Sequence, residues 1–315
     1  MKNLVQMIFY RLQHNTIYFL LALFVPPVVV IAALIYTNNI EQTIRLGVVG
    51  DFTIQEENIK VESLEEVPPL SKLVQGKYDA VVEKKGDVYK IQTVKGEEFR
   101  SSLDQVLNHG KSIEEAFQSG EKRGVISNLT GFLSMLTLLI GSMMYKFYYQ
   151  EKGAIERRIL ATKISHIQYS LSHCLVVFLI LFVPTVIITL FAKWILAMPT
   201  LATYGQIAFI LFTLCLLGSS FSFFIASIAN TEENGSLIST MIILVSSLVS
   251  GSFIEVAQSG IENTISHLFP QRYIVNFAIA IENGLKPGYT SMIVIILSCI
   301  FMILIGTWIS KKQNE

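Results

Sequence analysis

Charged residues are scarce in this sequence. Asp, Glu, Lys and Arg make up 15% of its 315 residues, against about 25% in a typical soluble domain. Apolar residues make up 52% of the chain, and this combination indicates a membrane protein. The acidic and basic residues balance to a formal net charge of zero, so the charge gives no indication of binding to nucleic acid.

Residues that could form disulfides or hold a metal ion are also few. All three cysteines fall in apolar stretches, and none is part of a CxxC pair; they are Cys174, Cys215 and Cys299. The five histidines are scattered, with no pair at the spacing of metal ligands. The sequence therefore predicts neither a disulfide framework nor a metal site.

The sequence also lacks a nucleotide-binding loop. The nearest stretch is Gly110-Lys111-Ser112, but Gln105 stands where a P-loop has its first glycine. No arrangement of a nucleophile with a base is recognisable, so the sequence does not predict an enzyme. ATP hydrolysis, if the protein uses it, would belong to a separate chain.

Long apolar runs are what the sequence has instead. About 20 apolar residues cross a bilayer as a helix, and six runs of that size carry no charge apart from Lys146 at the end of the second. The predicted spans are residues 16–37, 124–146, 171–192, 204–229, 236–254 and 289–310. Because these runs offer no carboxylate to a coupling ion, a proton- or ion-coupled carrier is disfavoured. Their many serines fit either close helix packing or a lining for cargo.

A short helix precedes the first span. Leu4, Ile8 and Leu12 share one helical face, while Lys2 and Arg11 lie elsewhere. Residues 1–15 are therefore predicted to form an amphipathic helix in the membrane interface.

A polar segment follows the first span. Residues 38–123 contain 16 acidic and 12 basic residues and no run long enough to cross a bilayer. Residues 45–49, 78–83 and 87–94 have the pattern of strands, the last two forming a hairpin, and residues 101–118 have the pattern of a helix. The segment is predicted to be a small α/β domain.

The distribution of Lys and Arg predicts the orientation. Short basic loops stay in the cytoplasm. Together with Lys146 at the end of span 2, the stretch between spans 2 and 3 and the two terminal segments carry nine Lys and Arg, and the opposite short loops carry three. Both termini are therefore expected in the cytoplasm, with residues 38–123 outside. The predicted fold is a polytopic α-helical membrane protein of six spans, with an N-terminal interfacial helix and an extracellular α/β domain between spans 1 and 2.

The basic stretch at residues 147–170 contains a recognisable motif. Glu151-Lys152-Gly153 opens a helical pattern, which ends near Thr162 and Ser165. This run resembles the first cytoplasmic loop of ABC-2-type permeases, the membrane subunits of ATP-driven exporters, in which an acidic-basic-Gly triplet opens a short coupling helix. Gly153 is also expected to permit a sharp bend where the chain leaves the bilayer.

The stretch at residues 255–288 is too apolar for a plain loop, yet Pro270, Asn276 and Asn283 interrupt it. Two short helices that dip into the outer leaflet are predicted here. Together with the preceding Ser250-Gly251-Ser252, this layout resembles the Pro-containing outer hairpin of the same family.

The resemblance implies a function. The chain would be the permease of an exporter in the plasma membrane, paired with two ABC ATPase subunits, which bind ATP and Mg²⁺, and with a second permease copy or paralogue. The cargo would be a hydrophobic or amphipathic molecule such as an antibiotic, peptide or lipid. An ATP-independent channel or carrier, and a membrane-anchored sensor with an outer ligand-binding domain, are the alternatives. The residues expected to couple to the ATPase are Glu151, Lys152, Gly153, Arg157, Arg158 and Thr162.

Overall fold

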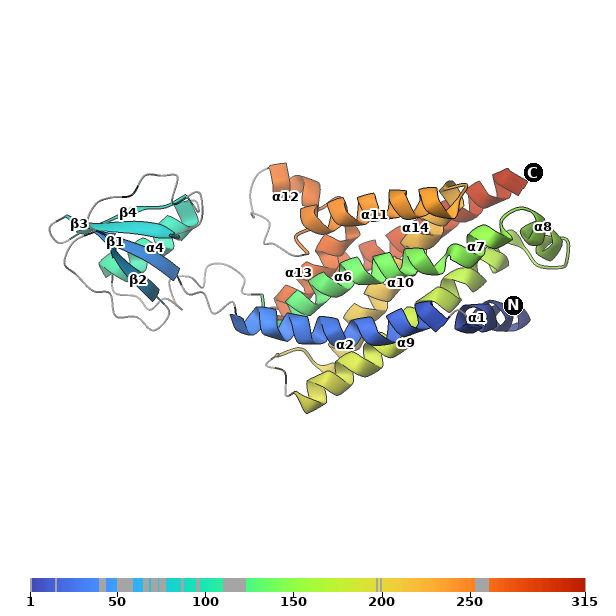
Figure 1. The fold of residues 1–315 in the computed structure, drawn as a ribbon, viewed down its shortest axis with the longest axis horizontal. Coiled ribbons are helices and arrows are strands. Elements are labelled where there is room, and N and C mark those ends of the chain that lie inside the picture. The colour runs from blue at the N-terminus through green and yellow to red at the C-terminus, as the bar shows by residue number, and fades with distance from the viewer. Residues whose placement is uncertain are drawn as a thin grey trace. The chain divides into compact units, whose positions relative to one another are not determined.

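The chain folds into two compact units, a helical unit of Met1–Ile35 with Arg123–Glu315 and a smaller unit of Tyr36–Lys122 (Figure 1). The structure is a computed structural model. It describes residues 2–14, 16–39, 44–49, 59–64, 68, 73, 78–85, 88–94, 97–109, 123–196, 198, 200–252 and 261–314.

The helical unit contains most of the predicted spans. Its helices are α1 (Lys2–His14), α2 (Thr16–Asn39, which runs into the smaller unit), α6 (Val125–Met144), α7 (Lys146–Glu151), α8 (Ala154–Leu160), α9 (His166–Ile195), α10 (Tyr204–Ile228), α11 (Glu232–Val249), α12 (Ile261–Ser266), α13 (Pro270–Glu282) and α14 (Tyr289–Asn314).

Four stretches of helix in the described part of the chain are long and apolar enough to cross a membrane: Val125–Glu151, His166–Ile195, Tyr204–Ile228 and Tyr289–Gln313. They coincide with four of the six predicted spans and make the chain a polytopic membrane protein. The other two spans stay predictions. One corresponds to the shorter apolar stretch Leu23–Thr37 within α2, and the other to α11, which begins with two glutamates.

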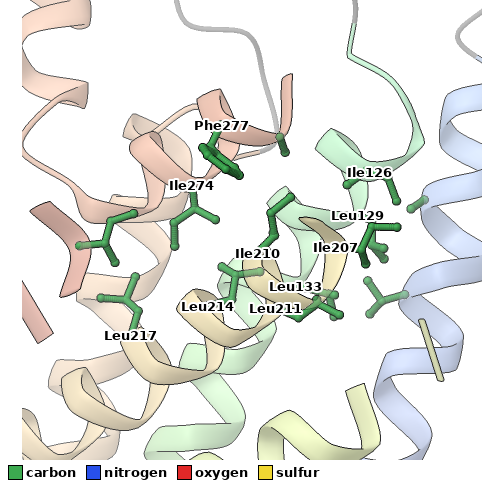
Figure 2. Close-up of a cluster of buried hydrophobic side chains, with 14 of the residues drawn as sticks. Ile126, Leu129, Leu133, Ile207, Ile210, Leu211, Leu214, Leu217, Ile274 and Phe277 are labelled. Atoms are coloured by element: carbon green, nitrogen blue, oxygen red, sulfur yellow. The ribbon is translucent and has the colours of Figure 1, made fainter. Parts of the chain in front are cut away.

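The main core of the helical unit lies where α6, α10 and α13 meet (Figure 2). Apolar side chains recur every three or four residues on each helix, so that they form one face. The labelled core residues are Ile126, Leu129 and Leu133 of α6, Ile207, Ile210, Leu211, Leu214 and Leu217 of α10, and Ile274 and Phe277 of α13.

Small residues bring α6 and α10 close together. A Cβ atom at Gly218 would lie 3.0 Å from the Thr137 carbonyl oxygen, and one at Gly141 would lie 2.7 Å from Ser222 Oγ. Small residues at such contacts let helix backbones approach. The serines of α10 are buried here, which agrees with close helix packing, the first of the two interpretations left open for them.

Two capping boxes set the starts of α9 and α10. Ser165 and Gln168 exchange side-chain and backbone hydrogen bonds at the start of α9. Thr203 and Gln206 do the same at the start of α10. Such pairs satisfy two free backbone N–H groups at once. As a result α9 begins at His166, earlier than the predicted residue 171.

The smaller unit contains a four-stranded sheet in the order β2-β1-β3-β4. Its elements are β1 (Ile44–Val49), β2 (Ile59–Leu64), β3 (Ala80–Lys85), β4 (Val88–Gln92) and α4 (Glu97–His109). β1 is parallel to both β2 and β3, and β3 and β4 form the predicted antiparallel hairpin. Leu46, Val48 and Val82 form its core with Leu103 and Val106 of α4.

The prediction for this unit was wrong in two respects. It did not include β2, whose charged Lys60 and Glu62 alternate with Ile59 and Val61 as in a strand with one solvated face. It also began the helix at residue 101, whereas α4 begins at Glu97. Residues 110–118, the end of the predicted helix, lie outside the described residues.

Residues 261–282 form two helices, as predicted for this stretch. Pro270 occupies the first turn of α13, where its missing N–H costs nothing. Asn276 lies inside α13 and does not interrupt it, contrary to the prediction. An Asn in a helix interior costs less than about 1 kcal/mol, and buried Ile274, Val275 and Phe277 around it favour the helix by packing.

Candidate coupling site

The candidate site lies at the end of the helical unit where α8 is found. The N-terminal helix α1 and the last turns of α14 lie at the same end (Figure 1). α7 ends at Glu151, and α8 starts at Ala154 after a turn in which Gly153 has φ +94°. Only glycine adopts such a backbone readily, so the bend predicted at Gly153 is confirmed.

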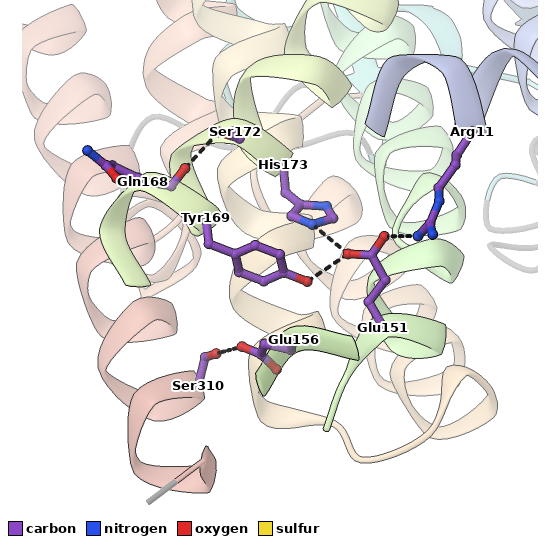
Figure 3. A network of polar contacts seen from close by, with 8 residues as sticks. All are labelled: Arg11, Glu151, Glu156, Gln168, Tyr169, Ser172, His173 and Ser310. Atoms are coloured by element: carbon purple, nitrogen blue, oxygen red, sulfur yellow. Dashed lines mark hydrogen bonds and ion pairs between the residues drawn. The ribbon is translucent and has the colours of Figure 1, made fainter. Parts of the chain in front are cut away.

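Glu151 is buried at this end, with 1% of its surface exposed. Its Oε2 accepts a hydrogen bond from the Tyr169 hydroxyl at 2.9 Å and lies 3.3 Å from His173 Nε2. Its Oε1 forms an ion pair with Arg11 of α1 (Figure 3). A buried carboxylate needs such partners, because losing its hydration is costly. Glu151 therefore joins α7 to both α1 and α9.

Lys152, the next residue, bonds to the end of α10. Its ammonium group donates to the carbonyl oxygens of Ala226, Ser227 and Ala229, at 3.3, 3.1 and 2.7 Å. These carbonyls end α10, where backbone acceptors lack helical partners and the helix dipole is negative. Burial lowers the pKa of Lys152 below its usual value, while the carboxylate of Glu156 opposes that shift. Lys152 thus caps α10.

Glu156 is the one buried residue of α8, with 1% of its surface exposed. Its Oε1 accepts a hydrogen bond from Ser310 Oγ of α14 at 2.7 Å (Figure 3). Its Oε2 is buried without a hydrogen-bond partner in the described part of the chain. Glu156 therefore attaches α8 to α14.

These three side chains, at the end of α7, in the turn and on α8, bond to four other elements. Glu151 reaches α1 and α9, Lys152 reaches α10 and Glu156 reaches α14. A displacement of α8 would act directly on the contact of Glu156 and, through the turn at Gly153, on the contacts of Glu151 and Lys152, so the arrangement suits transmission of motion between α8 and the spans.

Residues 110–283, more than half of the chain, match the family model for ABC-2 type transporters. The chain belongs to the ABC-2 type transporter family. No curated protein sequence matches it. Chains of this family are membrane transport subunits that are generally not themselves catalytic, and in general they work with ABC ATPase partners.

The structure divides the predicted coupling residues of the permease into two groups. Glu151 and Lys152 bond within the chain, and Gly153 forms the turn. Arg157, Arg158 and Thr162 are exposed. Both arginines lie on the exposed side of α8, whereas Glu156 is buried and Ile159 and Leu160 pack against the core.

Sequence reasoning did not include the internal partners of the motif. Arg11 and Ser310 lie far from the motif in sequence, and Tyr169 and His173 follow it on α9. Glu156 was not among the predicted coupling residues. One signal was available, since a lone histidine in an apolar span needs a polar partner. In the described part of the permease, no three His, Cys, Asp or Glu side chains lie close enough to hold a metal ion.

Proposed function

We propose that this permease is the membrane subunit of an ATP-driven exporter, and that α8 transmits the motion of its ATPase subunits to the spans. The observation that carries the proposal is the two-sided character of α8. One side presents Arg157 and Arg158 to solvent, and the other side carries the buried Glu156 that bonds to α14.

The exposed pair supports a contact with an acidic protein surface. Charged residues at the rim of an interface set orientation and specificity more than affinity. Thr162, exposed just beyond α8, would extend this contact. Glu151, Lys152 and Gly153 contribute indirectly in this proposal, because they hold α8 in place.

The proposed assembly has two permeases, a homodimer or a pair of paralogues, and two ATPase subunits that bind ATP and Mg²⁺. The basic residues around α8 support a cytoplasmic location for this end and for both termini. The smaller unit would then be extracellular. Apolar spans without carboxylates support a hydrophobic or amphipathic cargo rather than an ion.

The experiment is reversal of the exposed charges, with Arg157→Glu and Arg158→Glu in one permease. The readouts are co-purification of the ATPase that accompanies the unmodified permease and ATP hydrolysis by the complex. Like charges brought together in an interface cost several kcal/mol, so we expect at least about tenfold less ATPase retained, which corresponds to about 1.4 kcal/mol.

The matched control is Lys311→Glu with Lys312→Glu, a second exposed basic pair at the same end of the helical unit. It should retain the ATPase. If the unmodified permease co-purifies with no ATPase, the exporter proposal is wrong and a carrier or sensor is favoured. If the arginine variant retains as much ATPase as the control, the assignment of the contact to this pair is wrong.

A further inference from the structure

The first turn of α6, at the other end of that helix from α8, is capped by a residue from far along the chain. Glu282 accepts hydrogen bonds from the backbone N–H groups of Gly124, Ile126 and Ser127, at 2.9, 2.6 and 3.0 Å. The Ser127 hydroxyl also donates to it. The N-cap residue of α6, Gly124, provides no side-chain cap of its own. A single carboxylate therefore satisfies most of the free donors at this helix start.

The position of Glu282 is unfavourable for its own helix. It is the last residue of α13, and a negative charge at a helix C-terminus opposes the helix dipole. The same charge is favourable at the N-terminus of α6, where the helix dipole is positive. The interaction with α6 therefore compensates for the unfavourable position of this negative charge at the C-terminus of α13.

A second contact holds the residues that follow α11 against the same part of α6. Arg123 donates to the carbonyl oxygens of Gly251 and Ser252, and Ser134 Oγ donates to Ser252 Oγ at 3.1 Å. A Cβ atom at Gly131 would lie 1.9 Å from the Ser252 carbonyl oxygen, so the two backbones meet where only glycine fits. Residues 123–134 therefore hold both the end of α11 and the end of α13.

α6 and α7 connect this junction to α8. The stretch Val125–Glu151 has 27 residues and would be about 40 Å long at 1.5 Å per residue. Its far end carries Glu151, which bonds to α1 and α9 and directly precedes the turn that leads to α8. A movement of α8 would therefore travel along α6 and α7 to residues that are bonded to Glu282.

We infer that Glu282 is a positioning residue that couples the helical hairpin of α12 and α13 to movements of α6. Its carboxylate fixes the end of α13 to the first turn of α6, so that the hairpin follows α6 when the ATPase subunits move α8. The inference rests on the proposed exporter function and extends it to the end of α6 remote from the ATPase.

The test uses the complete complex with its ATPase and a cysteine at Leu268, which follows α12 and is 78% exposed. The three native cysteines are buried and should react slowly. The rate at which an impermeant maleimide labels Leu268→Cys is measured without nucleotide and after trapping with ATP and vanadate. In the otherwise unmodified permease we expect the two rates to differ.

Two variants should abolish that difference. Glu282→Gln removes the charge and turns an amide N–H₂ toward backbone donors. Gly124→Ala keeps the glutamate at position 282 but puts a Cβ atom 2.6 Å from its carboxyl carbon. The carboxylate must therefore move away from the first turn of α6. In both, the ratio of the two labelling rates should fall to one while ATP hydrolysis persists. A purely stabilising role would not separate hydrolysis from labelling in this way.

The matched control is Gly205→Ala at the start of α10, where a Cβ atom would have no neighbour within 4 Å. It should keep the nucleotide-dependent ratio. If both variants keep that ratio, Glu282 does not couple the hairpin to α6. If an ATPase co-purifies but labelling of Leu268→Cys never depends on nucleotide, the inference is wrong while the proposed function stands. Absence of any ATPase contradicts both.

Discussion

Glu156 of α8 and Ser310 of α14 are joined by a hydrogen bond of 2.7 Å between side chains 154 positions apart in the sequence. Both side chains are buried. The bond joins the helix that we assign to the ATPase contact directly to the last span. It also places a carboxylate inside the protein, with its second oxygen lacking a hydrogen-bond partner in the described part of the chain.

Removing the serine hydroxyl should therefore be costly. Ser310→Ala leaves a buried acceptor without its donor, which typically costs about 1–3 kcal/mol. We expect a lower thermal unfolding temperature of the purified permease. Glu156→Gln should reduce this cost, because a neutral amide is easier to bury than a carboxylate, so the double variant should be less unstable than the sum of the two changes.

The control for this pair is Ser298→Ala on the same helix. Among the residues that the structure describes, Ser298 Oγ donates to the carbonyl oxygen of Val294, one turn back in α14. Its loss should change the unfolding temperature little. Equal effects of Ser310→Ala and Ser298→Ala would mean that the contact with Glu156 contributes nothing to stability.

Gly153 offers a test of the backbone at the start of α8. A Cβ atom there would have no neighbour within 4 Å, so Gly153→Ala introduces no clash. Its only cost is the positive φ of 94°, which for a residue with a side chain is of order 1–3 kcal/mol. We expect reduced thermal stability and weaker ATPase retention, because α8 would start in another direction.

Gly205→Ala serves again as the control, since Gly205 lies in the first turn of a helix with open space around it. Replacing a helical glycine by alanine stabilises a helix by up to about 1 kcal/mol. If Gly153→Ala is as stable as this control and binds the ATPase equally well, the turn does not set the position of α8.

The apolar runs of the sequence predicted the positions of the long helices, and the basic loops predicted their orientation. Both features depend on residues that are close together in sequence. The ends of the helices were also encoded locally. Ser165 and Thr203, each followed three residues later by glutamine, mark the starts of α9 and α10, and this capping signal was overlooked in the prediction of residue 171 as a span boundary.

The roles of Glu151 and Glu156 could not be predicted in the same way. Their partners Arg11 and Ser310 lie 140 and 154 positions away, and no short-range pattern records such a pairing. A charged residue beside a span is usually solvated, so the motif was interpreted as a surface. The role of Glu282 was not predicted for the same reason, since the groups that donate to it lie at residues 124–127, more than 150 positions away.

The orientation of the permease is the last prediction, and it can be tested without knowing the cargo. Cysteines are introduced singly at Ser63 of β2, Ser101 of α4 and Ala161, which follows α8; all three positions are exposed. Ala161 is used rather than the nearby exposed Ser165, because a cysteine at Ser165 would remove the hydroxyl that caps α9. Since the basic residues around α8 favour a cytoplasmic location, an impermeant thiol reagent on intact cells should label the first two positions and not the third. After permeabilisation, Ala161→Cys should be labelled as well, which verifies that its thiol is reactive. The native cysteines are buried, so the unmodified permease gives the background. If only Ala161→Cys is labelled on intact cells, the orientation is opposite to the predicted one. α8 would then lie outside the cell, where a cytoplasmic ATPase cannot contact it.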